Sequence, residues 1–184
     1  QLRMDVARRF EDMSVYEADL NAAFTRLNNE CPSFVIPKVY TQVSAFNQSI
    51  VVGDSLIGVS LDKYLGAEYP AYKKYFYENQ RATMESARIV QDCLFFYLNQ
   101  QYAFPNKGHK HTLGEWMVQQ GRIGWVVSKL ICKKPIDVAA YQPATKRWYT
   151  SHEREVWATM SRPELWNSTD SIKLHSLMMT SDAH

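Results

Sequence analysis

Only one stretch of this 184-residue sequence has the pattern of β-structure, residues 35–61, and most of the rest is patterned as helix. In residues 39–43, Val39, Thr41 and Val43 alternate with Tyr40 and Gln42, as side chains on the two faces of a half-buried strand do. Residues 47–48 can turn the chain, residues 49–52 then form a returning strand, and residues 56–61 are apolar enough for a third. A sheet of this size is stable only with helices packed against it.

Three capping boxes, in which Ser or Thr precedes Glu by three residues, mark expected helix starts. They lie at Ser14/Glu17, Thr112/Glu115 and Thr150/Glu153. The first helix should end before Pro32, because a residue that precedes proline avoids the helical region. Gly121 and Gly124 interrupt the helix after Thr112, which suggests that another backbone approaches it closely there.

Residues 82–101 form a further expected helix with one apolar face. The face comprises Met84, Ala87, Val90, Cys93, Leu94 and Tyr97. No repeat or linker divides the chain. We therefore expect one predominantly helical α+β domain over residues 1–184, with a small antiparallel β-hairpin or sheet at about 36–61 packed on helices.

Composition excludes several classes of function. The net charge of +2 is too small for a dedicated nucleic-acid binder, and no run of 18 apolar residues could span a membrane. The three cysteines, Cys31, Cys93 and Cys132, form no CxxC pair, so they indicate neither a zinc knuckle nor a redox site. Their disulfide status and the cell compartment stay open at this point.

The histidines do not assemble a recognisable metal site. His109 and His111 lie two residues apart, with no Cys or carboxylate nearby to complete a ligand set. His152-Glu153 begins like the HExxH zinc motif, but Val156 stands where the second histidine is required. No catalytic, metal-binding or cofactor-binding residue is therefore assigned, and no cofactor is expected.

Aromatic residues make up 13% of the chain, and several gather between residues 64 and 77. Tyrosine is enriched where one end of the ring is buried and the other is wet, as at partner surfaces. Tyr69, Tyr72, Tyr75 and Tyr77 are the candidate partner surface. The alternative is that these rings belong to the core of a helical domain, and some of them can do both.

Several motifs, in order along the chain, resemble the gliding-motility-associated lipoprotein GldB family of Bacteroidetes. Residues 54–66 read DSLIGVSLDKYLG, and Tyr69-Pro70 follows. Further matches lie at Ile89–Asp92, Thr112–Arg122, Tyr149–Trp157 and Ser168–Asp170. The resemblance spans roughly residues 15–175. It implies that the chain is truncated at both ends, because the family's lipidated N-terminal cysteine and its usual last helix are missing.

The resemblance also implies a function. The family is similar to zincin-like metallopeptidases, whose active members carry HExxH on their first long helix. Here that helix is expected at residues 82–101, which contain no histidine, and Met84–Arg88 place Met and Arg where histidine is needed. A degenerate zincin-like pseudoenzyme without its metal is therefore implied.

Its expected role is that of a non-catalytic outer-membrane lipoprotein facing the periplasm. It would support gliding-motility or secretion machinery through contacts with envelope proteins, and would meet the membrane only through a lipid anchor absent from this chain. Two other hypotheses stay open. One is a divergent zinc metallopeptidase using His109, His111 or His152. The other is a peptide-binding module with a groove beside the strand edge near Ser49–Val52.

Overall fold

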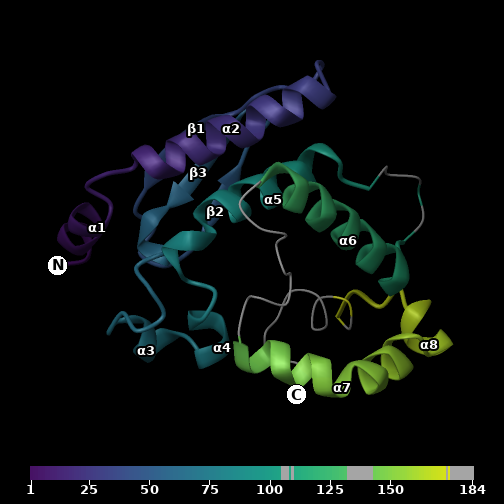
Figure 1. Cartoon of the computed structure of the whole chain (residues 1–184). Helices are drawn as coiled ribbons and strands as arrows, with labels where there is room; N and C mark the ends of the chain where they lie inside the picture. The colour runs from purple at the N-terminus through teal and green to yellow at the C-terminus, as the bar shows by residue number, and fades with distance from the viewer. Residues whose placement is uncertain (105–107, 109, 132–142, 173, 175–184) are drawn as a thin grey trace. The chain divides into compact units, whose positions relative to one another are not determined.

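The computed structural model describes residues 1–104, 108, 110–131, 143–172 and 174 (Figure 1). The chain divides into two compact units. The first comprises Gln1–Ala103 with Gly124–Ile136, and the second comprises Phe104–Ile123 with Asp137–His184. The predominantly helical α+β class is confirmed. The expectation of a single domain stays a prediction.

The first unit carries the sheet and the helices around it. Its elements in chain order are α1 (Leu2–Arg9), α2 (Ser14–Glu30), β1 (Lys38–Gln42), β2 (Ile50–Val52), β3 (Leu56–Ser60), η1 (Leu61–Lys63), α3 (Tyr72–Tyr75), α4 (Glu78–Arg81), η2 (Ser86–Arg88) and α5 (Ile89–Gln101). Helix α6 (Leu113–Leu130) runs from the second unit into the first. The second unit also contains α7 (Pro143–Met160) and α8 (Pro163–Trp166).

The strands lie where the sequence predicts them, but their pairing differs from the expected antiparallel hairpin. Their order is β1-β3-β2, so the sheet is mixed. β3 pairs with β1 in parallel and with β2 antiparallel. The reason is burial: Ile57 and Val59 of β3 are almost completely buried, whereas every residue of β1 is exposed. The central strand of the sheet is therefore β3, the most buried of the three strands.

The loop between β1 and β2 is held by Asp62, whose side chain is completely buried. Its carboxylate accepts the backbone N–H groups of Ser44, at 2.9 Å, and Phe46, at 2.6 Å. Ala45 and Phe46 have φ angles of 55° and 68°, in the left-handed region that non-glycine residues rarely adopt. The two hydrogen bonds stabilise this conformation, which carries the chain from one edge of the sheet toward the other.

Helix α5 packs on β2 and β3, and α2 packs on α5. Tyr97 of α5 is fully buried, and its hydroxyl lies 3.0 Å from the Val35 carbonyl and 3.1 Å from the Asp54 carbonyl. The same ring meets Phe24 and Phe34 edge-on, with centroids 6.3 Å and 5.7 Å away. One side chain thus ties α5 to α2 and to the segments flanking the sheet.

Helix α5 begins at Ile89, seven residues later than the expected start at residue 82. The preceding backbone makes other hydrogen bonds: Gly66 donates to the Met84 carbonyl at 3.0 Å, and Ala67 donates to the Glu85 carboxylate at 2.8 Å. Most of the predicted apolar face is nonetheless buried. Ala87 is the exception, because it lies in η2 and is exposed.

The three capping boxes have different outcomes. That of Thr112 and Glu115 is formed, with reciprocal side-chain bonds of 3.2 Å and 2.8 Å. At Ser14, the Asp12 carboxylate accepts the Ser14 N–H instead, at 2.8 Å. Thr150 lies inside α7, because that helix begins at Pro143, and proline suits the first helical position.

The glycine that another group approaches closely is Gly114, which contradicts the expectation for Gly121 and Gly124. A Cβ atom built on Gly114 would lie 2.3 Å from Cε2 of Trp166, whereas, among the residues that the structure describes, nothing lies within 4 Å of a Cβ at the other two. The neighbouring Leu113 N–H donates to the Ser168 carbonyl at 2.9 Å. The start of α6 therefore rests against the α8 region within the second unit.

Replacing Gly114 with alanine should lower the free energy of unfolding by about 2 kcal/mol, because the added methyl overlaps the Trp166 ring. The matched variant Gly121→Ala should raise it by about 0.5–1 kcal/mol, since the site is open and alanine favours helix. Urea denaturation followed by tryptophan fluorescence measures both. Equal effects of the two substitutions would contradict the contact.

Replacing Asp62 with alanine should lower the free energy of unfolding by about 3 kcal/mol, because two backbone N–H groups lose a charged acceptor. Asp54→Ala is the control: its side chain is exposed, and only its backbone carbonyl accepts hydrogen bonds in the core. Its effect should stay within about 0.5 kcal/mol. Circular dichroism during urea denaturation compares the two, and equal losses would show that Asp62 does not hold the loop.

Candidate functional site

The four tyrosines of the predicted partner surface do not share one exposed face. Tyr75 and Tyr77 are 69% and 67% exposed, but Tyr72 is completely buried. Tyr69 is half-buried, and its hydroxyl donates to the Asp5 carboxylate at 2.9 Å. Tyr72 therefore belongs to the core, and Tyr69 connects α1 to the segment before α3. The exposed pair Tyr75 and Tyr77 is called the tyrosine patch below.

One member of the tyrosine patch, Tyr75, rests on a cluster of rings around Phe46. The Phe46 centroid lies 5.4 Å from that of Tyr72, and 6.3 Å from those of Tyr75 and Phe76. The Lys63 amine lies 4.1 Å from the centre of the Phe76 ring. Because Asp62 orients Phe46 through its backbone N–H, the exposed Tyr75 has a fixed support beneath it.

Tyr72 links this cluster to the polar core. Its hydroxyl donates to the Asp62 carbonyl and accepts the Leu65 N–H at 3.1 Å. Burial is the main cause that raises the pKa of the Tyr72 hydroxyl, so the hydroxyl stays protonated and able to donate. This arrangement explains why Tyr72, the second of the four predicted tyrosines, lies in the interior.

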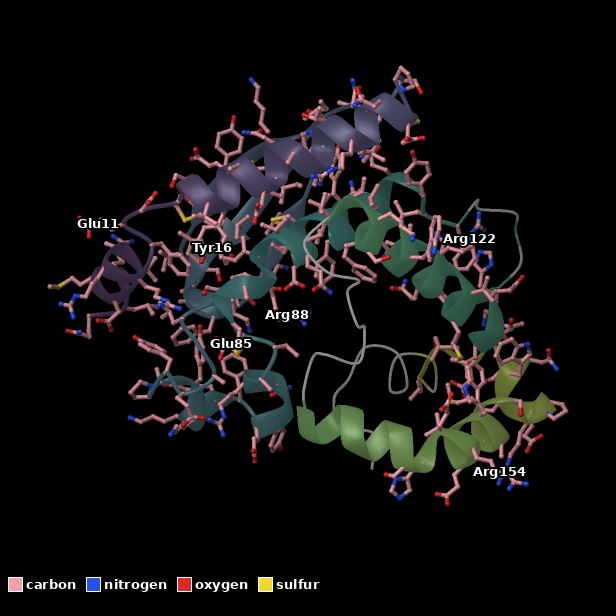
Figure 2. The ribbon with its side chains drawn as sticks, viewed as in Figure 1. Glu11, Tyr16, Glu85, Arg88, Arg122 and Arg154 are labelled. Carbon is pink, nitrogen blue, oxygen red and sulfur yellow. The ribbon has the colours of Figure 1, made fainter. Side chains whose placement is uncertain are left out.

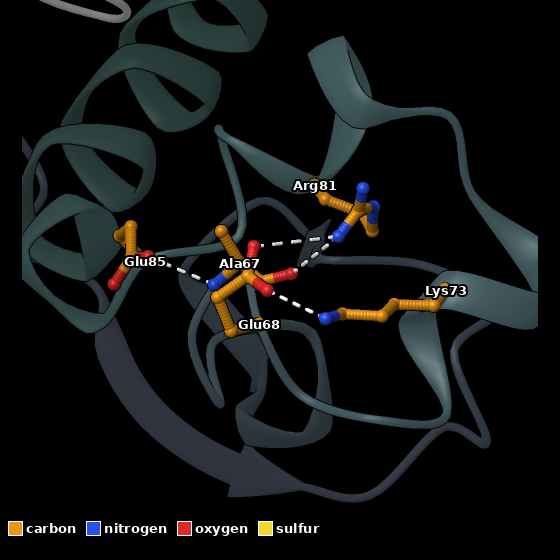
Figure 3. A network of polar contacts seen from close by, with 5 residues as sticks. All are labelled: Ala67, Glu68, Lys73, Arg81 and Glu85. Carbon is orange, nitrogen blue, oxygen red and sulfur yellow. Dashed lines mark hydrogen bonds and ion pairs between the residues drawn. The ribbon is translucent and has the colours of Figure 1, made fainter.

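A polar network holds the turn that precedes α3 (Figure 3). The Ala67 N–H donates to Glu85, and the Ala67 carbonyl accepts from Arg81 at 3.2 Å. Arg81 also lies 3.5 Å from Glu68, which forms a 2.6 Å ion pair with Lys73. The segment compared with a degenerate zinc motif, Met84–Arg88, thus contributes a carboxylate to a structural turn.

A second buried carboxylate, Asp92, lies on α5. It accepts the Tyr64 hydroxyl at 2.9 Å and an Arg88 guanidinium N–H at 3.0 Å. Figure 2 labels Arg88 together with Glu85, which lies three residues before it. Burial raises the pKa of Asp92, although Arg88 and the Tyr64 hydrogen bond act in the opposite direction. Burial also raises the pKa of the Cys93 thiol to about 12, so Cys93 is not a reactive thiolate.

Two histidines lie within the described residues, His111 and His152, and both belong to the second unit. His111 stacks on Phe104 with centroids 3.9 Å apart and lies 3.7 Å from Glu115. His152 lies on α7, where its Nδ1 is 2.9 Å from the Ser151 hydroxyl. His109 lies outside the described residues. Within the part of the chain that the structure describes, no three His, Cys, Asp or Glu side chains come together as a metal site.

The cysteines that the structure describes, Cys31 and Cys93, are free. Cys132 lies outside the described residues, so its disulfide status stays open. Among the helices that the structure describes, none is both long and apolar enough to cross a bilayer.

A groove between α2 and β1 is a feature of the first unit that the sequence did not predict. Its volume is about 560 Å³, within the usual range for ligand sites. Its lining residues are mostly apolar or aromatic: Met13, Tyr16, Glu17, Leu20, Asn21, Phe24, Ile36, Pro37, Val39, Tyr40, Thr41, Val59 and Ile89. In Figure 1, α2 runs alongside β1.

Both β1 and β2 are outer strands of the sheet, but the groove borders β1 and not the predicted edge at Ser49–Val52. The only sequence feature that relates to the groove is the apolar character of residues 35–43, several of which remain exposed. Val35, Ile36 and Tyr40 are 55%, 50% and 57% exposed. A strand pattern does not reveal which strand lies at the edge, so this signal could not have located the groove.

Comparison with known families agrees with the motifs along the chain. The family model described as gliding motility protein GldB matches residues 1–182. No curated protein and no solved structure gives a significant match. The match covers nearly the whole sequence, and we conclude that the chain belongs to the gliding motility protein GldB family.

Proposed function

We propose that this chain is a non-catalytic lipoprotein component of gliding-motility or secretion machinery, which acts through contacts with other envelope proteins. Membership of the GldB family supports an association with motility and with the cell envelope. The contact role, the lack of catalysis and an outer-membrane position facing the periplasm are parts of the proposal.

The observation that carries the non-catalytic role is the use of the interior carboxylates. Asp62 accepts backbone N–H groups of the β1–β2 loop, and Glu85 accepts that of Ala67. Asp92 accepts from Tyr64 and Arg88. A general base must reach a proton on a substrate, whereas these three carboxylates are engaged with donors of their own chain. Their contacts support a structural role for each.

The tyrosine patch supports the contact role. Exposed tyrosine rings bury a large apolar area in an interface and lose little rotamer freedom, which suits them to binding hot spots. Tyr75 and Tyr77 are more than two-thirds exposed, and Tyr75 lies against Phe46 on a base anchored by Asp62. The exposed Lys74 directly precedes Tyr75 and the exposed Glu78 directly follows Tyr77, so side chains of both charges flank the patch.

Replacing both Tyr75 and Tyr77 with serine should abolish or strongly reduce gliding in a gliding strain whose own copy of the gene is deleted. Loss of one hot-spot ring typically costs about 2 kcal/mol of binding, or roughly thirtyfold in affinity. Cell gliding speed is the measurement, and immunoblotting shows whether the variant accumulates normally.

The matched control replaces Met4 and Val15 with serine, because these side chains are exposed to a similar degree, 63% and 59%. It should glide at wild-type speed. Full gliding by the tyrosine variant would show that the patch is not the contact surface.

Replacing Asp92 with asparagine should remove a pH-dependent loss of folding stability. Because burial raises the pKa of Asp92, the folded state holds its proton to a higher pH than the unfolded chain does. The stability of the wild type relative to the variant should therefore fall as pH rises from about 4, the carboxyl's unfolded value. Urea denaturation between pH 4 and pH 7 measures this difference.

Tyr64→Phe provides the internal check. It removes a donor to the Asp92 carboxylate, so the fall in relative stability should extend to higher pH. A non-catalytic Asp92 also means that the folded Asp92→Asn protein supports gliding. A variant that is stable and normally abundant but cannot glide would favour the metallopeptidase hypothesis.

A further inference from the structure

β1 is an outer strand of the sheet, and three of its residues, Val39, Tyr40 and Thr41, line the groove between α2 and β1. In a parallel ladder, alternate residues of a strand direct their backbone groups to opposite sides. The Lys38 N–H donates to the Ser55 carbonyl at 2.9 Å, so Lys38, Tyr40 and Gln42 face β3. The backbone groups of Val39 and Thr41 therefore face away from β3.

These outward groups lie at an edge that another chain can extend. β1 is an outer strand of the sheet, and Val39 and Thr41 both line the groove. Pro37 lies two residues before Val39 and faces the same side, but it has no N–H. It therefore cannot donate a hydrogen bond to an added strand. Pairing is thereby confined to the five residues of β1, a length of about 16 Å.

The groove also limits the side chains of an added strand. Its walls offer apolar contacts from Tyr16, Leu20 and Ile36, which favour an apolar side chain at alternate positions. Glu17 is the one charged side chain among the residues that line it, and it is exposed. A lysine or arginine in the occupant would complement that charge.

We propose that the groove between α2 and β1 binds an extended segment of a partner protein, which adds as a strand to β1 and carries an apolar residue and a basic residue. The segment's backbone bonds to Val39 and Thr41, its apolar side chain enters the groove, and its basic side chain lies against Glu17. This inference rests on the proposed function as a protein-contact component, and it assigns the chemical class of one partner segment.

A phage-displayed library of random octapeptides, selected against the full purified chain, tests the proposal. Selected peptides should be poor in proline, should alternate in apolarity and should contain lysine or arginine. Their synthetic copies are then titrated by fluorescence anisotropy. Thr41→Pro should weaken binding about five- to tenfold, because it removes one outward N–H and leaves the β1–β3 ladder intact. Glu17→Gln should weaken it about threefold and reduce its salt dependence.

The matched control is Val52→Pro on β2. Ser60 donates to Ser49 and Gly53 donates to Leu56, so the alternation places Val51 toward β3 and Val52 away from it. Val52→Pro therefore removes an outward N–H from the other outer strand and should leave peptide affinity unchanged. Equal effects of the two proline variants would overturn the proposal, as would a selection that enriches no sequence.

Amide hydrogen exchange keeps the test independent of any folding defect in the variants. In the wild-type chain, the Val39 and Thr41 N–H groups should exchange at least tenfold more slowly once the peptide is bound. Binding without this protection would overturn strand addition. Concentration-dependent self-association that Thr41→Pro abolishes would identify a second copy of the chain as the occupant, and would also overturn the proposal.

The peptide-binding experiment and the gliding experiment can fail independently of each other. Loss of peptide binding with intact dependence of gliding on Tyr75 and Tyr77 would remove this inference and leave the proposed function standing. Peptide binding combined with full gliding by the tyrosine variant would remove the tyrosine patch as the contact surface and leave the peptide-binding groove standing.

Discussion

The buried carboxylate of Asp62 is the interaction on which much of the first unit depends. It binds two N–H groups of a loop whose Ala45 and Phe46 have left-handed backbone angles. Without the Asp62 carboxylate at that point, nothing would compensate the loop for its left-handed conformation and for its part-buried N–H donors. The loop carries the chain from β1 at one edge of the sheet to β2 at the other, which leaves the centre to β3. The same loop presents Phe46 to Tyr72, Tyr75 and Phe76, so the sheet order and the support of the tyrosine patch have a common origin.

The interior polar residues follow a consistent principle. Asp62, Glu85 and Asp92 each accept hydrogen bonds from segments distant in the sequence, and Tyr64, Tyr72 and Tyr97 each place a hydroxyl on an acceptor. Buried polar groups are costly unless they are satisfied, and these groups satisfy one another while they fix loops in place. This distribution fits the contact function proposed above for this member of the gliding motility protein GldB family, in which the surface carries the function.

Two surfaces of the first unit differ in the recognition that they can support. The tyrosine patch offers two exposed rings, of which Tyr75 lies against Phe46, and suits contact with the folded surface of a partner. The free side of β1 offers backbone hydrogen bonds and a groove, and suits an extended segment. Outer strands are commonly guarded against unwanted pairing by proline or lysine, and Pro37 and Lys38 stand at the start of β1. Pro37 and Lys38 thus protect the first residues of β1 from unwanted pairing, but they do not protect Val39 and Thr41.

The sequence by itself determined the features that depend on neighbours a few residues apart. The span of α2, the Thr112 cap of α6, the positions of the strands and most of the buried face of α5 follow from periodicity, capping and proline, and the family was evident from the order of motifs. Tertiary structure alone decided the parallel pairing of β1 with β3, the burial of Tyr72, the late start of α5 and the contact of Gly114 with Trp166. Each of these depends on which distant group arrives beside a residue. A local pattern reports which face of an element is apolar, but it does not report which element will cover that face.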